Sequence, residues 1–202
     1  CAPGGYLDSQ GYSLTSTRAV IPQISTLLSL ARTHSFPVFF TCEGHRPDLS
    51  DLTPRELFRS RQNASGRGIG DPGPMGRHLV RGEQGHAIIP ELWPRFGEPV
   101  VDKPGRSAFV YTDFELLLKV RGVVNLIITG VTTDVCVSST MREANDRGFE
   151  CLLVTDACGA GVERLHWATV ESVAEEGGIF GATAGTGAVV EAVEGWAAGE
   201  GM

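Results

Sequence analysis

The chain predicts an α/β layered fold, in which short buried strands alternate with amphipathic helices. Four short and mostly apolar runs occupy residues 36–42, 99–102, 123–129 and 151–155. Runs of this kind are typical of parallel strands that are buried on both faces. Segments with helical periodicity lie between or after them, and this alternation indicates a parallel sheet covered by helices.

The first predicted helix covers residues 15–34, because its apolar side chains recur at helical spacing. These side chains are Val20, Ile24, Leu27, Leu28 and Ala31. Further helices are predicted at about 112–121, 135–147, 163–176 and 186–197. Glycines end two of them, Gly148 after the second and the pair Gly177-Gly178 after the third.

Composition and charge exclude several classes of function. The chain has 202 residues, of which 42% are hydrophobic, enough for one globular domain over residues 1–202. Its 17 Lys and Arg against 24 Asp and Glu give a net charge of −7, so neither nucleic acid nor anionic membrane is expected as a partner. No apolar run is long enough to cross a bilayer and no signal peptide is visible. We expect a cytoplasmic protein with a small-molecule partner.

The cysteines form a scattered set without a Cys-x-x-Cys pair, which predicts neither a disulfide framework nor a zinc ribbon. They are Cys1, Cys42, Cys136, Cys151 and Cys158.

Residues 43–98 interrupt the alternation of strands and helices and are rich in proline and glycine. Loops this long inside a compact domain are commonly functional or disordered. This one follows the carboxyl end of a strand, where open α/β sheets bind ligands. We therefore expect a lid or an oligomer contact.

Cys136 is the candidate nucleophile. It lies in Gly130–Thr140, directly after the strand at 123–129, and so at a strand-to-helix junction. The positive end of the helix dipole and free backbone N–H groups there predict a lowered thiol pKa and a place for an oxyanion. Asp134 is the predicted N-cap of the helix. The alternative is that Cys136 is a small buried hydrophobic residue.

A nucleophilic thiol needs a cation that holds the thiolate, and Lys103 is the candidate. It follows the strand at 99–102, and Pro104-Gly105 end that strand. Because the carboxyl ends of parallel strands meet at one sheet edge, Lys103 and Cys136 are expected to lie close together. The alternative is a solvated lysine at a strand end.

The segments Lys103–Phe109 and Gly130–Cys136 resemble the lysine and cysteine motifs of the isochorismatase-like cysteine hydrolases. This family includes nicotinamidases, ureidoacrylate amidohydrolases and biuret hydrolases, and the opening Ala2–Asp8 also fits it. Other segments resemble the biuret and triuret hydrolase branch in particular. They are Cys42–Asp51, Ile69–Arg77, Ile88–Leu92 and Thr140–Gly148.

The resemblance implies a three-layer, Rossmann-like fold with a six-stranded parallel sheet flanked by helices, and commonly a homotetramer. It also implies an Asp-Lys-Cys triad, of which Lys103 and Cys136 match two members. The matching Asp and its strand are expected before Cys1, so the first strand is missing from this sequence. Asp8 lies beyond a glycine turn and suits a turn role better.

The implied reaction is amide hydrolysis through a thioester-type intermediate. Cys136 would attack the carbonyl, the Asp would carry the thiol proton to the leaving ammonia, and Lys103 would stabilise the thiolate. The backbone N–H groups of Thr132 and Cys136 would form the oxyanion hole after a non-proline cis peptide at Val131–Thr132.

Two further residues are candidates for substrate binding. Glu176 stands where the biuret hydrolase branch is expected to carry a glutamine, and an ionised Glu only accepts hydrogen bonds. Phe109, from the lysine motif, is a candidate pocket wall. The alternatives are a solvated helix end for Glu176 and a core aromatic for Phe109.

A metal or other cofactor is not expected. Nicotinamidases of the family bind a metal through a cluster with an Asp-x-His element, but this chain has Glu43-Gly-His45 there. Hydrogen bonding within the loop is the expected role of His45.

The sequence thus predicts a cysteine amidohydrolase for a small carbamoylated amide such as biuret or triuret. Ureidoacrylate-type and nicotinamide-type amides are alternatives within that class. A non-amidase member of the fold is less favoured, because both Cys136 and Lys103 are present. A catalytically silent scaffold remains the alternative if the upstream Asp is absent.

Overall fold

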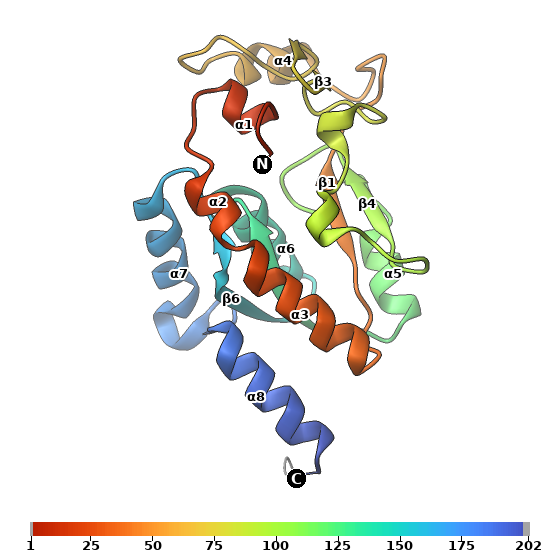
Figure 1. Cartoon of the computed structure of the whole chain (residues 1–202), viewed down its shortest axis with the longest axis vertical. Coiled ribbons are helices and arrows are strands. Elements are labelled where there is room, and N and C mark those ends of the chain that lie inside the picture. Colours follow the sequence, from red (N-terminus) through yellow and green to blue (C-terminus); the bar gives the residue numbers. More distant parts are fainter. Residues whose placement is uncertain (1, 200–202) are drawn as a thin grey trace.

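In the computed structural model of the protein, which describes residues 2–199, helices and strands alternate along the chain (Figure 1). This is the alternation that the sequence predicts. Cys1 lies outside the described residues. The parallel strands are β1 (Phe40–Glu43), β4 (Val100–Lys103), β5 (Asn125–Val131), β6 (Glu150–Gly159) and β7 (Ala182–Ala184). The first four overlap the predicted apolar runs and extend past their ends, and β7 was not predicted.

The predicted helices are present with small changes at their ends. The first is divided into α2 (Thr15–Ala19) and α3 (Ile21–Thr33), where Pro22 at the start of α3 favours a new helix N-terminus. The others are α5 (Phe114–Val120), α6 (Ser138–Asp146), α7 (Glu163–Gly178) and α8 (Thr186–Ala197). Within residues 2–199, no helix is long and apolar enough to cross a membrane.

Residues 43–98 are ordered into short elements. They contain α4 (Pro54–Ser60), the hairpin of β2 (Pro72–Gly73) and β3 (Gly76–Arg77), and the 3-10 helices η1 (Gln84–His86) and η2 (Pro90–Leu92). Thr53 caps α4 by accepting a hydrogen bond from the N–H of Glu56 at 3.1 Å.

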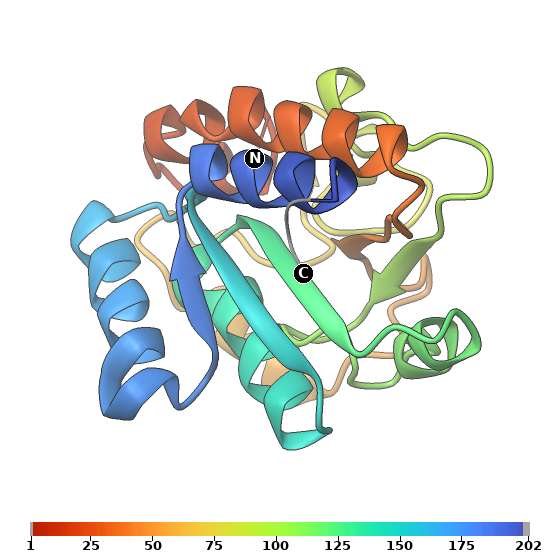
Figure 2. The same ribbon diagram turned by 90° about the horizontal axis from the view of Figure 1, so that it is seen from below.

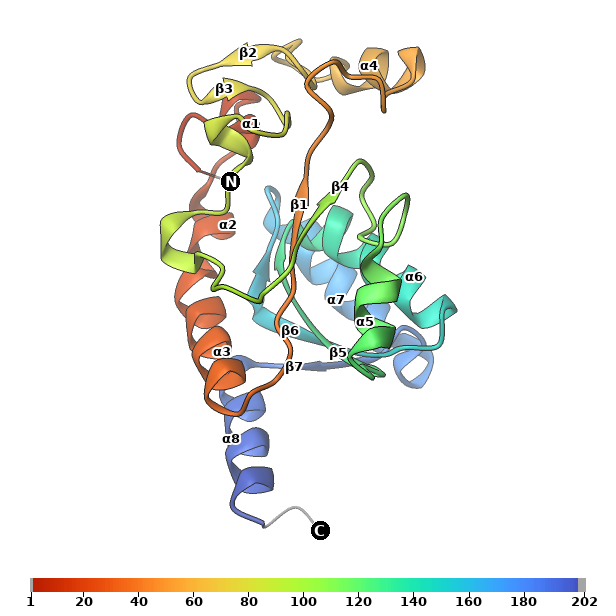
Figure 3. The same cartoon turned by 90° about the vertical axis from the view of Figure 1, so that its right-hand side faces the viewer.

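In Figure 3, α4, β2 and β3 lie beyond the carboxyl ends of the strands, near the short helix α1 (Tyr6–Ser9). Asp8 of α1 accepts a hydrogen bond from the N–H of Gly4 at 2.7 Å, which confirms its turn role. The role of residues 43–98 as a lid or an oligomer contact stays a prediction.

The five parallel strands form two groups, β1-β4 and β5-β6-β7. The resemblance implied one sheet of six strands, so the described residues differ from that expectation. The strand expected before Cys1 stays a prediction. In both groups the carboxyl ends of the strands point the same way, toward the segment that holds α4 (Figure 3).

Helices cover both faces of the strands, which confirms a layered α/β fold. In Figure 2, α3 and α8 lie side by side on one face, and α5, α6 and α7 lie on the other. The core on the α3 and α8 side joins these helices to β6. It consists of Leu27, Leu30, Val154, Ala157 and Val189.

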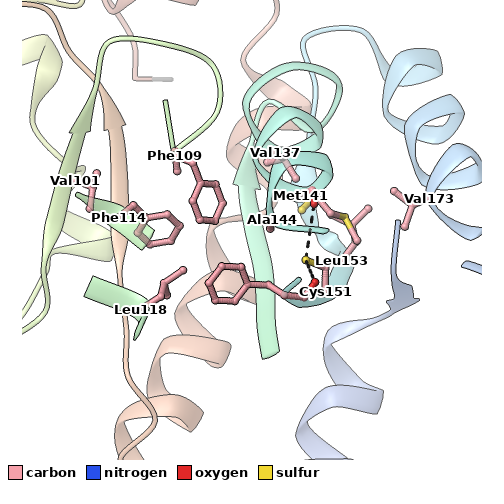
Figure 4. Packing of buried hydrophobic residues seen from close by; sticks show 13 residues of the cluster. Val101, Phe109, Phe114, Leu118, Val137, Met141, Ala144, Cys151, Leu153 and Val173 are labelled. Atoms are coloured by element: carbon pink, nitrogen blue, oxygen red, sulfur yellow. Dashed lines mark hydrogen bonds between the residues drawn. The ribbon is translucent and has the colours of Figure 1, made fainter. Parts of the chain in front are cut away.

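The larger core links the two groups of strands beneath α5 and α6. Figure 4 shows Val101 of β4 and Phe114 of α5 on one side, and Met141 of α6 and Leu153 of β6 on the other. Burial of this apolar surface holds the carboxyl ends of β4 and β5 in fixed positions.

Candidate active site

Cys136 lies at the junction between β5 and α6. The chain leaves β5 through a cis peptide bond at Val131–Thr132, as predicted. It then forms one π-helical segment, η3 (Thr133–Val137), before α6 begins. The prediction that Asp134 caps this helix is wrong: the N-cap is Thr132, and no side chain caps it.

Lys103, the last residue of β4, points at Cys136. Its Nζ lies 3.3 Å from Cys136 Sγ and donates to the carbonyl of Gly105 at 2.9 Å. Only 3% of Lys103 is exposed, so it is not the solvated lysine of the alternative interpretation. A buried ammonium requires partners of this kind. The structure thus brings the two expected residues together.

Glu43 is a second charged group beside the thiol. It ends β1 and is paired in register with Lys103 of β4. Its Oε2 lies 3.7 Å from Lys103 Nζ and 3.7 Å from Cys136 Sγ. In the sequence, Glu43 is part of an incomplete metal motif, which does not predict its place beside the thiol. Its position as the last residue of a strand next to β4 is the signal that could have placed it in the site.

The predicted lowering of the Cys136 pKa is wrong. Burial raises the pKa of this thiol above its ordinary value, the ammonium of Lys103 lowers it, and the carboxylate of Glu43 raises it. Lys103 therefore offsets only part of the effect of burial. Burial also raises the pKa of the other described thiols, to about 11 for Cys42 and Cys151 and to about 12 for Cys158.

His166 fastens the segment that carries Cys136, a contact that the sequence analysis missed. Its Nδ1 is hydrogen-bonded to Thr133 Oγ1 at 2.9 Å. Thr133 is fully buried and His166 is 7% exposed. Burial lowers the pKa of His166. The hydrogen bond ties α7 to η3, three residues before the thiol.

The expected oxyanion hole lies in the same turn. Thr132 follows the cis bond, and Cys136 lies within η3. The role of their N–H groups stays a prediction.

The two candidate substrate-binding residues lie elsewhere. Phe109 is buried in the larger core and packs against Phe114 and Phe149 (Figure 4). This position matches the core aromatic of the alternative interpretation. Glu176 is exposed in the non-helical end of α7, with φ of 51°. It lies ten residues along α7 from His166, and its substrate contact stays a prediction.

His45 is fully buried behind Glu43. Its Nδ1 lies 3.6 Å from Asp51 Oδ1 and its Nε2 lies 4.0 Å from Glu43 Oε1. Neither ring nitrogen has a hydrogen-bond partner among the described residues, so the expected hydrogen bonding within the loop involves only the backbone of His45. Across residues 2–199, no group of three or more His, Cys, Asp or Glu side chains is arranged to hold a metal ion.

A layered α/β fold, with a half-buried cysteine beside a buried lysine at the carboxyl ends of its strands, defines the class of α/β proteins with a candidate cysteine nucleophile. Within that class, a family model for the isochorismatase domain matches residues 5–185. The chain therefore belongs to the isochorismatase family.

Individual relatives agree with this assignment. The chain is 32% identical over 174 residues to the ureidoacrylate amidohydrolase RutB of Methylobacterium radiotolerans, covering 85% of this chain and 67% of the relative.

Solved structures share the fold. One is an isochorismatase family protein from Desulfovibrio vulgaris, with a TM-score of 0.71 and 27% identity, covering 87% of this chain and 84% of that one. Another is a cysteine hydrolase from Pseudomonas syringae, with a TM-score of 0.75 and 24% identity, covering 89% and 82%.

Proposed function

We propose that the protein is a cysteine-dependent amidohydrolase that cleaves a ureido compound and releases ammonia. The observation that carries the proposal is the 3.3 Å contact between Lys103 Nζ and Cys136 Sγ in a partly buried site. A cation at this distance stabilises the thiolate that a nucleophilic cysteine must form. Membership of the isochorismatase family and similarity to a ureidoacrylate amidohydrolase support the choice of reaction.

In the proposed reaction, Cys136 Sγ forms a bond to the carbonyl carbon of the substrate, and the negative charge moves to the carbonyl oxygen. The backbone N–H groups of Thr132 and Cys136 would hold that oxyanion. The bond to the terminal nitrogen then breaks, and ammonia leaves with the proton from the thiol. Water releases the acyl group from sulfur and restores the thiol.

The thiol proton needs a carrier. The family resemblance assigns it to an Asp on a strand before Cys1, and that assignment stays a prediction. Lys103 Nζ lies between a carbonyl, a thiol and a carboxylate, so its proposed role is to place positive charge beside the thiolate.

Two substrate types fit this proposal. Biuret is favoured by the motif resemblance, and ureidoacrylate is favoured by the name of the similar enzyme. Both carry a terminal ureido group, in which one carbonyl carbon bears an amino group and an inner N–H. We take this ureido group as the recognised unit. A nicotinamide-type amide is the second candidate substrate for an amidohydrolase. Outside this class, the alternative is a catalytically silent scaffold. The proposed assembly is a homotetramer.

The test is ammonia release from biuret, triuret, ureidoacrylate, nicotinamide and simple ureas. Cys136→Ser is expected to abolish release, whereas Cys42→Ser, which removes another partly buried thiol, is expected to retain it. Faster release from the ureido compounds than from nicotinamide would support the proposed substrate class. Equal background rates in the native protein and in Cys136→Ser would favour the scaffold.

A further inference from the structure

The carboxylate of Glu43 has no short hydrogen bond among the described residues. Lys103 Nζ and Cys136 Sγ both lie 3.7 Å from its Oε2, and His45 Nε2 lies 4.0 Å from its Oε1. Ordinary hydrogen bonds to oxygen span about 2.7–3.2 Å. Lys103 instead makes its shortest contact with the carbonyl of Gly105, at 2.9 Å.

Two other carboxylates, those of Glu56 and Asp51, lie closer to their donors than Glu43 does. Glu56 pairs with Arg106 at 2.5 Å, and Asp51 accepts the N–H of Arg46 at 3.1 Å. Both groups therefore have a close donor among the described residues. The side chain of Glu43 is 18% exposed, so its oxygens have acceptor capacity that a bound molecule can reach.

The position of Glu43 defines what that molecule must offer. A carbonyl carbon poised for attack lies about 3–3.5 Å from the nucleophile. With Oε2 only 3.7 Å from Sγ, a group bonded to that carbon falls within reach of the carboxylate. A carboxylate is an acceptor only, so this group must be an N–H donor.

A ureido group meets this requirement better than a simple carboxamide. When its carbonyl oxygen points into the oxyanion hole, its two N–H groups on the opposite side are parallel. They match the two oxygens of one carboxylate, and bidentate pairs of this kind are strong and directional. A carboxamide offers one N–H there, and a C–H in place of the other.

We propose that Glu43 is the specificity residue that selects ureido compounds by accepting both N–H groups beside the attacked carbonyl. This inference rests on the proposed amidohydrolase function. Glu43 thereby orients the carbonyl carbon over Cys136, and Lys103 fixes the carboxylate from the other side.

The experiment compares substrates that differ only in the second N–H. Malonamide is biuret with the central N–H replaced by a methylene group, and glutaramate is N-carbamoyl-β-alanine with the same replacement. For each pair, kcat/KM for ammonia release is measured in the native protein, in Glu43→Gln and in Glu43→Asp. The matched control is Glu191→Gln, which changes an exposed carboxylate on α8.

The native protein is expected to prefer the ureido member of a pair by about 10-fold to 100-fold, the range for one hydrogen bond to a charged group. Glu43→Gln keeps one acceptor oxygen and is expected to lower this ratio about 10-fold, whereas Glu191→Gln leaves it unchanged. Glu43→Asp withdraws the carboxylate by one methylene and is expected to lower the ratio as well.

Two results would overturn the inference and leave the proposed function intact. One is an unchanged ratio in folded Glu43→Gln and Glu43→Asp. The other is an equal loss for both members of each pair, which would identify Glu43 as a proton carrier. Absence of Cys136-dependent release from all four compounds would overturn the proposed function and the inference with it.

Discussion

Replacing Lys103 with methionine is expected to slow the alkylation of Cys136 sharply at neutral pH. Methionine fills a similar volume without the charge, so the change removes the cation that lies 3.3 Å from Sγ. The carboxylate of Glu43 stays beside the thiol and raises the pKa of Cys136. Both effects raise the pKa of the thiol in the variant and reduce the thiolate fraction.

The size of the effect follows from the distance. Coulomb's law with an effective dielectric constant of about 20 gives about 5 kcal/mol for opposite charges 3.3 Å apart. If water enters the site and doubles the effective dielectric constant, about half of this Coulomb energy remains. The thiolate fraction then falls by about 70-fold, the value for about 2.5 kcal/mol. Because a more basic thiolate is also a better nucleophile, the alkylation rate falls by about 10-fold.

The assay is the pH dependence of iodoacetamide alkylation, with the modified peptide identified by mass spectrometry. Lys119→Met is the matched control, because Lys119 is exposed and pairs only with Glu115 on the same helix. A thermal unfolding curve shows that each variant is folded. An unchanged pH profile of Cys136 in folded Lys103→Met would refute the assignment of Lys103 as the cation that holds the thiolate.

Three further variants test the fold around the site. Thr133→Val leaves His166 Nδ1 without its buried partner and is expected to cost about 1–3 kcal/mol in urea unfolding, whereas Thr133→Ser retains stability. Leu118→Ala, at a fully buried core position, is expected to cost about 2–5 kcal/mol in the same assay. Arg32 holds the pKa of Glu98 below its usual range, so Glu98→Gln is expected to lose about 1–3 kcal/mol at pH 7. The contact with Arg32 stabilises only the ionised carboxylate of Glu98. The difference in stability between the native protein and Glu98→Gln should therefore shrink in thermal unfolding as the pH falls through the folded-state pKa of Glu98.

Four of the five parallel strands, the longer helices and the meeting of Cys136 with Lys103 could be predicted from sequence, because each depends on local patterns. Apolar runs mark the strands, and the carboxyl ends of parallel strands share one edge. The cap of α4 was not predicted, although Thr53-Pro54-Arg55-Glu56 carries a capping residue followed three positions later by a glutamate.

Features that depend on pairing between distant segments could not be predicted. Glu43 enters the site because β1 pairs with β4 in one particular register, which joins Glu43 to Lys103. His166 reaches Thr133 from α7, a separate helix further along the chain. The thiol pKa was mispredicted because a strand-to-helix junction indicates a favourable dipole but not the depth of burial, which dominates here.

The central claim is that Cys136 forms the covalent bond to the substrate. The most direct measurement is mass spectrometry of the protein quenched in acid during turnover of biuret or ureidoacrylate. The account predicts an added mass equal to the substrate minus ammonia on the peptide that contains Cys136, in the native protein and in Cys42→Ser. Ammonia release that continues undiminished in Cys136→Ser, with no adduct on this peptide, would contradict it.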